Sequence, residues 1–342
     1  MKRASGYEVV FAEGAFDEGS DALAAVLRKI TGAERPRVML VADMNVVQHT
    51  QGLGRRIGAY MHAHGLDLAG QPVVIPGGEK AKFDDMHGAL RVAAAAVESM
   101  IGPDGCMLVL GGGVKVVRMP TTVAAMLDAA YADNAALDLA EAKDALRVPA
   151  APSAVVVDVS FASTVLDGVW RAGYSEAVRI ATVCDAALAR RLADLAEGFK
   201  SRSREALDET VRAVAALRGK KGDTGFAQWA ALRLEAMSGY KLPHGYAVAI
   251  GIALDTAYAQ LRGLMSSADR DIVCGTLEGC GAMDGAQHSR HLLSRADAVL
   301  QGLETWRFVS KSGEIAVPKG LGRHVSELPD IATMKQALDM LK

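Results

Sequence analysis

The chain has 342 residues, which is long for one ordinary hydrophobic core, so two domains are expected. Apolar residues make up 50% of the chain and charged residues 23%, a balance typical of a globular protein in water. The formal net charge of −2 gives no electrostatic reason to expect a nucleic-acid partner. The basic residues are scattered, and the short cluster Arg218, Lys220 and Lys221 is interpreted as a solvated loop.

The cysteines and the apolar runs indicate the cellular location of the protein. The cysteines have no CxxC spacing; Cys106 lies in a predicted buried strand and Cys184 in a predicted helix, which suits the reduced thiols of a cytosol. The first residues hold no apolar run long enough for a signal peptide. No run approaches the roughly 18 apolar residues of a membrane span. We therefore expect a cytoplasmic protein with no membrane partner.

The first half of the chain alternates predicted strands with predicted helices. Apolar runs predict strands over Tyr7–Ala12, Arg37–Val41, Pro72–Ile75, Cys106–Leu110, Val114–Met119 and Ala154–Val157. Helical spacing predicts helices over Ser20–Ile30, Gly52–Ala63, Phe83–Met100 and Thr121–Ala130, with a weak helical signal over Tyr131–Ala151. This alternation predicts an α/β, doubly wound N-terminal domain with a parallel sheet, over residues 1–159.

The second half changes to long amphipathic helices. They are predicted over about Gly168–Ala196, Ser203–Leu217, Gly225–Met237 and Gly245–Met265. The remainder mixes short helices with a pair of strands at Trp306–Val309 and Glu314–Val317. Residues 160–342 are therefore expected to form a mainly helical domain.

Three successive glycines, Gly111, Gly112 and Gly113, follow the predicted strand Cys106–Leu110. Successive glycines after a strand let the backbone come close to a ligand, commonly a phosphate. In most such sites a helix follows, with its N-terminus facing the anion. Here the next segment, Val114–Met119, is predicted to be a strand that Pro120 ends. The sequence thus predicts a phosphate cradle without its usual helix.

Several short motifs resemble those of the dehydroquinate synthase-like family of sugar phosphate cyclases, almost from end to end. They are Pro76-Gly-Gly-Glu-Lys-Ala-Lys82, Gly111-Gly-Gly-Val114, Pro120-Thr-Thr122, Ala172-Gly-Tyr-Ser-Glu-Ala-Val-Arg179 and His244-Gly-Tyr-Ala-Val-Ala-Ile-Gly251. The segments Trp229-Ala-Ala231, Leu234-Glu235, Ala249-Ile-Gly-Ile-Ala-Leu-Asp255 and Gly302-Leu-Glu304 are most similar to its EboD-like branch. The resemblance implies an NAD-binding α/β domain, an all-α metal-binding domain and an active site between them.

The resemblance also implies which residues hold NAD. They are Glu79, Lys82, Gly111, Gly112, Gly113, Thr121, Thr122 and Lys143. Carboxylate and ammonium groups suit ribose hydroxyls and phosphate, and bare amides suit a pyrophosphate. Each has an ordinary alternative: Glu79 and Lys82 as surface charges, and the two threonines as a helix N-cap. Asp43, at the end of a predicted strand, either meets a ribose or caps the next helix.

The family's metal site has one Glu and two His around zinc or a similar divalent ion such as cobalt. Glu176 and His244 match two of these ligands, while the third position holds Gln228, a weak neutral ligand. Without the resemblance, the favoured interpretation is that Glu176 is a surface-helix acid and His244 an N-terminal helix residue. The cations left at the substrate site are Lys143 and Arg179, and Arg179 replaces a Lys that can carry a proton.

Other family features are missing. The segment GGGxxGD and its helix are absent between Val114 and Lys115, Asn134 replaces a Lys, and Tyr246 replaces a Glu. The loop that supplies an Arg to the substrate is shortened to about Gly219–Thr224. Each lost cation weakens the hold on a doubly charged substrate. We therefore expect a weakened metal site.

The reaction implied by the resemblance oxidises a sugar phosphate with NAD, eliminates phosphate, reduces the ketone and closes a ring. We expect such a lyase with impaired or altered activity, a small sugar phosphate as its substrate, and a chain that allows a homodimer. One alternative is a catalytically degenerate homologue that acts as a binding or scaffold protein. A second alternative is an alcohol dehydrogenase of the glycerol dehydrogenase type, which shares this architecture.

Overall fold

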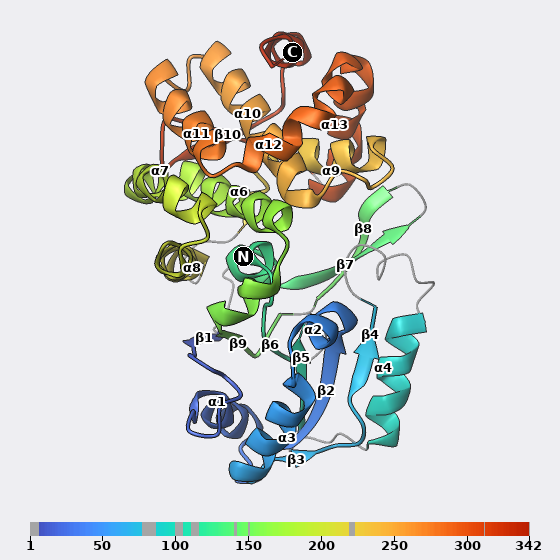
Figure 1. Ribbon diagram of the computed structural model, residues 1–342. Coiled ribbons are helices and arrows are strands. Elements are labelled where there is room, and N and C mark those ends of the chain that lie inside the picture. The colour runs from blue at the N-terminus through green and yellow to red at the C-terminus, as the bar shows by residue number, and fades with distance from the viewer. Residues whose placement is uncertain are drawn as a thin grey trace. The chain divides into compact units, whose positions relative to one another are not determined.

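The computed structural model describes residues 7–76, 87–99, 105–110, 116–139, 142–149, 151–218, 223–310 and 312–341. The chain divides into two compact units, which are described one at a time (Figure 1). The first consists of Met1–Asp138 with Leu146–Val165, and the second of Leu139–Ala145 with Leu166–Lys342. The placement of a domain boundary at residue 159 stays a prediction, because compactness does not show independent folding.

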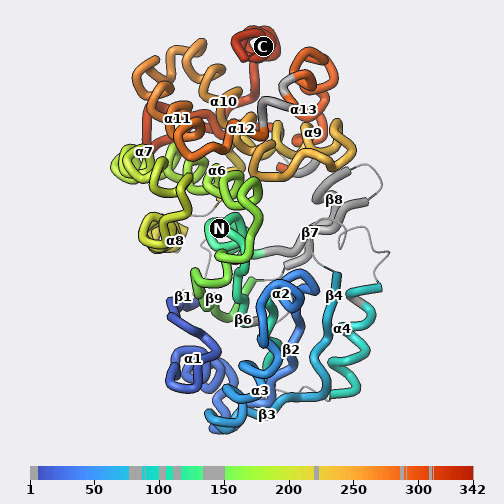
Figure 2. The backbone as a smooth tube through the Cα atoms, in the orientation of Figure 1, coloured from blue at the N-terminus to red at the C-terminus, as the bar shows by residue number. Residues whose placement is uncertain are grey.

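The first unit is built on a seven-stranded parallel sheet. Its strands are β1 (Glu8–Phe11), β2 (Arg37–Asp43), β3 (Asp67–Leu68), β4 (Val73–Ile75), β5 (Gly105–Leu110), β6 (Val116–Arg118) and β9 (Ala154–Val157). The order across the sheet is β1-β9-β6-β5-β2-β3, and β4 pairs with the carboxyl-terminal half of β2. Figure 2 shows β1 and β9 side by side although they come from opposite ends of the unit. The predicted parallel α/β domain is confirmed.

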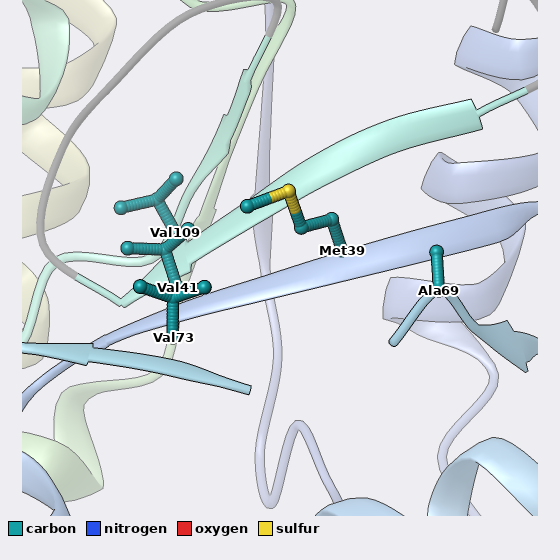
Figure 3. Close-up of a cluster of buried hydrophobic side chains, with 5 residues drawn as sticks. All are labelled: Met39, Val41, Ala69, Val73 and Val109. Carbon is teal, nitrogen blue, oxygen red and sulfur yellow. The ribbon is translucent and has the colours of Figure 1, made fainter. Parts of the chain in front are cut away.

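Helices fill the connections of this sheet. They are α1 (Ala22–Thr31), α2 (Met44–His49), α3 (Leu53–Ala63), α4 (His87–Glu98) and α5 (Val123–Leu127), with 3-10 turns at Ala129–Tyr131 and Val159–Thr164. Figure 3 shows a core cluster in which Met39 and Val41 of β2 meet Val73 and Val109 of the flanking strands. Side chains of α4 pack on this cluster. Because Val38 and Leu40, on the opposite face of β2, are also buried, both faces of the sheet are covered.

Residues 131–151 do not form the weak helix that their composition suggested. They contain β7 (Asn134–Leu139) and β8 (Ala142–Pro149), which pair as a separate two-stranded sheet. Alanine favours helices only weakly, and pairing within the folded chain overrides that preference.

The second unit is mainly helical, as expected. Its helices are α6 (Asp167–Cys184), α7 (Ala186–Lys200), α8 (Arg204–Arg218), α9 (Gln228–Met237), α10 (His244–Leu261), α11 (Ser267–Gly279), α12 (Ala282–Ala286), α13 (Ala296–Ser310) and α14 (Ile331–Asp339), with a 3-10 helix at Gln287–Ser294. Helices α6 and α10 are buried over most of their length, and α10 packs on α6, α9, α11, α12 and α14. A helix that is apolar all round has to lie inside such a bundle.

Two boundaries in this unit differ from the prediction. The long helix over 168–196 is interrupted at Asp185, whose side chain caps α7 by accepting a hydrogen bond from Leu188 N at 3.0 Å. The expected strand at Trp306–Val309 is the end of α13, and the strand pair is instead β10 (Ile315–Pro318) with β11 (His324–Glu327). Within the described part of the chain, no helix is long and apolar enough to cross a membrane.

Close packing of α10 on the start of α9 gives the first prediction. A Cβ at Gly251 would lie 2.6 Å from the carbonyl oxygen of Ala227, which is backbone and cannot step aside cheaply. We expect Gly251→Ala to lower the free energy of unfolding by about 1–3 kcal/mol, measured by urea denaturation. Gly275→Ala in α11 is the matched control, because nothing lies within 4 Å of its Cβ. It should be neutral or stabilise by up to about 1 kcal/mol.

Candidate functional site

In the second unit the amino-terminal end of α10 packs against the middle of α6, and both helices are buried. A Cβ at Gly245 would overlap the carbonyl oxygen of Ala172, so only glycine allows this approach of the two helices. The Ser175 hydroxyl lies 2.8 Å from the Gly245 carbonyl oxygen and ties the helices together. As a result, the residue one turn after Ala172 on α6 meets the residue before Gly245 on α10 in the interior of the unit.

Glu176 and His244 meet at this junction. The Nε2 atom of His244 lies 3.1 Å from Oε1 of Glu176, and the Glu176 side chain is only 1% exposed. That oxygen accepts no hydrogen bond from any described residue, so the two atoms are close without being bonded in line. The expected convergence of these two ligands is therefore present, and Glu176 is not a surface acid.

The other nitrogen of His244 is held by Glu235. Its Nδ1 lies 2.7 Å from Oε1 of Glu235, a carboxylate that is buried at the end of α9. The loop between α9 and α10 is fixed by Ser238, whose hydroxyl donates to the Glu235 carbonyl and accepts from Leu242 N. A carboxylate on Nδ1 keeps the proton there and orients the ring. Nε2 is thereby directed at Glu176.

The guanidinium of Arg179 is bound on the far side of Glu176. Its Nε donates to Oε2 of Glu176 at 2.7 Å, and Nη1 donates to Oδ1 of Asp223 at 2.8 Å. The side chain is 1% exposed. Arg218, expected in a solvated loop, is also buried, with Nη1 3.9 Å from Asp223 Oδ1. Its sequence neighbours Lys220 and Lys221 lie outside the described residues.

These contacts shift the pKa values of the cluster. Burial disfavours the charged form of Glu176, but the charges of Arg179 and His244 outweigh it and hold its pKa below the usual range. Burial likewise opposes a charged His244, yet the charges of Glu235 and of the nearby Glu176 raise its pKa to about 10. The Asp223 pKa is lowered by Arg179 and Arg218 against the effect of burial. The shifts at His244 and Glu176 thus each favour the charged form of the side chain.

Gln228 is the first residue of α9 and is half-buried. Among the described residues, no hydrogen bond or ion pair joins it to Glu176 or His244. Its position is fixed by Asp255 of α10, which accepts hydrogen bonds from Ala227 N at 3.1 Å and Trp229 Nε1 at 2.9 Å. The assignment of Gln228 as a third ligand stays a prediction.

The residues expected to bind NAD follow adjacent strands of the first unit. Asp43 ends β2, Thr121 and Thr122 come shortly after β6, and Ala42 of β2 is in register with Leu110 of β5. In a parallel sheet the carboxyl ends of the strands share one edge, where ligands commonly bind. Asp43 caps α2 by accepting from Asn45 N at 2.7 Å, and Thr122 caps α5 by accepting from Ala125 N at 3.3 Å. Capping, one of the two roles left open for each, is thus present.

The remaining cofactor candidates cannot be placed in the same way. Glu79 and Lys82, which follow β4 in the chain, lie outside the described residues, as do Gly111, Gly112 and Gly113 after β5. Lys143 belongs to β8 and Asn134 to β7, in strands whose side chains are not described. The roles expected for them stay predictions.

The buried pair fits part of a divalent metal site. An oxygen of Glu176 without a donor faces Nε2 of a histidine whose other nitrogen is held by a carboxylate, an arrangement common around bound metals. Among the described residues, no group of three His, Cys, Asp or Glu side chains completes a metal site. The structure therefore brings together two residues that were expected to bind a metal, with Arg179 already paired to one of them.

Two carboxylates escaped the functional predictions made from the sequence. Glu235 was noted only as a residue of the EboD-like branch, although an acid nine positions before His244 on an apolar helix is a signal of a buried partner. Asp223 lies in a short polar segment that has the composition of an ordinary loop. Its role depends on a contact with α6 that spacing alone does not show.

Comparison with curated proteins finds relatives that carry one name. A 3-dehydroquinate synthase of Rhodopseudomonas palustris strain BisA53 is 26% identical over 330 residues, covering 86% of this chain and 82% of the relative. The enzyme of the same name from Shouchella clausii is 26% identical over 207 residues, which span only 57% of its own length. No protein-family model matches the chain.

Solved structures show the same fold over nearly the whole chain. ValA, a 2-epi-5-epi-valiolone synthase from Streptomyces hygroscopicus subsp. jinggangensis 5008, matches with a TM-score of 0.75 at 21% identity, covering 100% of this chain and 98% of its own. A 2-deoxy-scyllo-inosose synthase matches with a TM-score of 0.71 at 14% identity, covering 98% and 96%. A probable glycerol dehydrogenase from Sinorhizobium meliloti matches with a lower TM-score of 0.64.

The chain has the fold of these sugar phosphate cyclases and of the probable glycerol dehydrogenase. Its similarity to relatives named 3-dehydroquinate synthase, at 26% identity, supports the resemblance to the 3-dehydroquinate synthase-like family. The narrower assignment to the EboD-like branch stays a prediction.

The buried Asp255 gives a prediction about pH. Burial raises its pKa to about 7, against the hydrogen bonds from Trp229 and Ala227, whereas an unfolded Asp has a pKa near 4. Folding therefore takes up a proton between about pH 4 and 7, and this residue's contribution to stability falls as pH rises through that window. We expect the difference in unfolding free energy between wild type and Asp255→Asn to change by a few kcal/mol over the window, measured by urea denaturation.

The matched control for this experiment is Asp271→Asn, on the exposed face of α11. It should reproduce the pH dependence of the wild type. Equal pH dependence of wild type and Asp255→Asn would contradict a raised pKa at Asp255.

Proposed function

We propose that the chain is a 3-dehydroquinate synthase-like sugar phosphate cyclase, a carbon–oxygen lyase, with altered or impaired activity. The observation that supports this best is the meeting of Glu176 and His244 across α6 and α10, with Glu235 behind the imidazole. These residues belong to two motifs shared with the family, and the structure brings them together. Phosphate elimination and ring closure of a sugar phosphate is the reaction that follows from this assignment.

The proposed cofactors are NAD and a divalent metal. The ValA structure holds NAD+ and Zn2+, and the 2-deoxy-scyllo-inosose synthase structure holds carbaglucose-6-phosphate, NAD+ and Co2+. When bound, NAD accepts and returns a hydride, and the metal polarises a hydroxyl group. In this chain Glu176 and His244 would hold the metal. Residues after β4, β5 and β6, together with Lys143, would hold NAD.

The chain's own residues limit the chemistry. Glu235 holds the Nδ1 proton and leaves Nε2 of His244 as the only nitrogen of the ring directed at the junction. Arg179 is committed to two carboxylates, and a guanidinium stays protonated at any working pH, so it cannot pass a proton to or from a substrate. Of the two catalytic cations expected from the resemblance, only Lys143 keeps that capacity.

A catalytically degenerate homologue that binds NAD or a sugar phosphate is the second candidate. It is favoured by the pairing of Arg179 with Glu176 and Asp223, which occupies the charge that a phosphate or carboxylate of the substrate would need. The glycerol dehydrogenase type has the same architecture but no observation of its own in its favour. A cytoplasmic location and a homodimer also stay predictions.

The first experiment measures phosphate release and NAD affinity on one preparation. The purified chain is incubated with a heptulosonate phosphate, NAD and Co2+ or Zn2+, and inorganic phosphate is followed with time. We expect slow release that needs both added groups, and its loss in Glu176→Gln, because this change removes a carboxylate that the metal requires. Arg191→Gln, which alters an exposed ion pair with Glu209, should retain the wild-type rate.

Two outcomes separate the candidates. NAD binding without any phosphate release supports the degenerate homologue and contradicts the cyclase. Oxidation of glycerol-like alcohols, followed as reduced nicotinamide, would revive the dehydrogenase.

A further inference from the structure

Arg179 lies where a second cation would have to share Glu176. Its Nε is 2.7 Å from one carboxylate oxygen of Glu176, and the other oxygen faces His244. Arg179 and Glu176 are three residues apart on α6, so they occupy the same face of that helix. A divalent ion on the free oxygen would therefore bind a carboxylate that already carries a counter-ion.

Asp223 balances the charge of Arg179 from another segment. Its Oδ1 accepts from Arg179 Nη1 at 2.8 Å and from Gly225 N at 3.1 Å. The side chains of Arg179, Arg218 and Asp223 border a cavity of about 10 Å³. Such a space is at the lower limit for one water molecule, so the described residues leave little room beside the guanidinium.

The charges beside Glu176 compensate one another. The buried Arg179 and Arg218 face the carboxylates of Glu176 and of the partly exposed Asp223. In a low-dielectric interior, adding or removing one charge in such a group changes the energy of every other charge. The affinity for an added cation therefore depends on the neighbours of Glu176 as well as on its ligands.

We propose that the Arg179–Asp223 pair sets the affinity of the Glu176–His244 site for a divalent cation, with Arg179 opposing the cation and Asp223 favouring it. This inference rests on the proposed function, because it concerns the metal of the same site. An arginine suits this role, since its planar fork reaches two carboxylates on different segments at once. A lysine in its place is a single point charge that cannot bridge them in the same way.

The test is calorimetric titration of the full-length chain with Zn2+ and, separately, Co2+. Arg179→Gln removes the opposing cation and should tighten binding by about tenfold. Asp223→Asn leaves Arg179 and Arg218 less compensated and should weaken binding by a similar factor. Arg191→Gln is the control, because it removes an exposed arginine of α7 and should leave the affinity unchanged.

Opposite shifts separate the proposed electrostatic role from a merely structural one. If the pair only supported the fold, both substitutions would loosen the site and weaken the metal together. The Asp223 side chain is 42% exposed, so Asp223→Asn is expected to fold even if Arg179→Gln does not. Weaker metal binding by Asp223→Asn supports the proposal when its thermal unfolding temperature equals that of the wild type.

Equal affinities in all four proteins, weaker binding by Arg179→Gln, or no measurable binding by any of them would overturn the inference. These outcomes are independent of the proposed function, which is judged by phosphate release and NAD affinity. Phosphate release with a metal affinity that does not change in Arg179→Gln would support the proposed function and contradict this inference. Opposite shifts in metal affinity without phosphate release would support this inference and contradict the proposed function.

Discussion

The close approach of α6 to α10 at Gly245 is the constraint on which the candidate site depends. Because residue 245 has no side chain, the carbonyl of Ala172 can lie against α10, and Glu176 one turn later reaches His244. Gly245 and His244 of one motif thus have separate roles. Gly245 allows the close approach of the two helices, and His244 contacts Glu176 across it. Glu235, brought in by the short loop before His244, then fixes the imidazole. The packing of α6 against α10 thus determines which side chains meet at the candidate site.

The substitutions that separate this chain from its family are linked by charge. An Arg at 179 would be costly in an apolar interior by itself, but Glu176 on its own helix and Asp223 on the shortened loop take up its donors. The same loop was expected to have lost a substrate-binding cation, and in the structure it supplies an acid. Arg179 therefore pairs with acids of the chain itself, while Oε1 of Glu176 keeps no hydrogen-bond donor among the described residues.

Much of this could be predicted from the sequence where the pattern is local. Apolar runs located the strands of the parallel sheet except the short β3, and helical spacing located α6 to α10 with α6 and α7 joined as one helix. Such patterns are visible because burial of one face repeats with the period of the element. Residues 134–149 were missed since an Ala-rich segment has no strong period and its pairing depends on the folded chain. Glu176 and His244 were found through their motifs. The contacts of Asp223 with Arg179 and Arg218 were not found, because they join a loop to α6 and to the end of α8, which sequence spacing does not show.

In the first unit the parallel strands β5 and β6 pair although few residues connect them. Parallel neighbours usually need a connection of a dozen or more residues, yet β5 and β6 pair across five, residues 111–115. The register matches Met107 with Val116, so the chain must return about 11 Å from Leu110, and six residue steps reach roughly 20 Å. The pairing is therefore geometrically possible without a helix. The sequence predicts no helix N-terminus beside the glycines, and so none of the electrostatic help that such an end gives a pyrophosphate. We therefore expect NAD binding in the first unit to depend on backbone amides and on the charged residues that follow β4. The Glu176 site in the second unit depends instead on the balance between neighbouring side-chain charges.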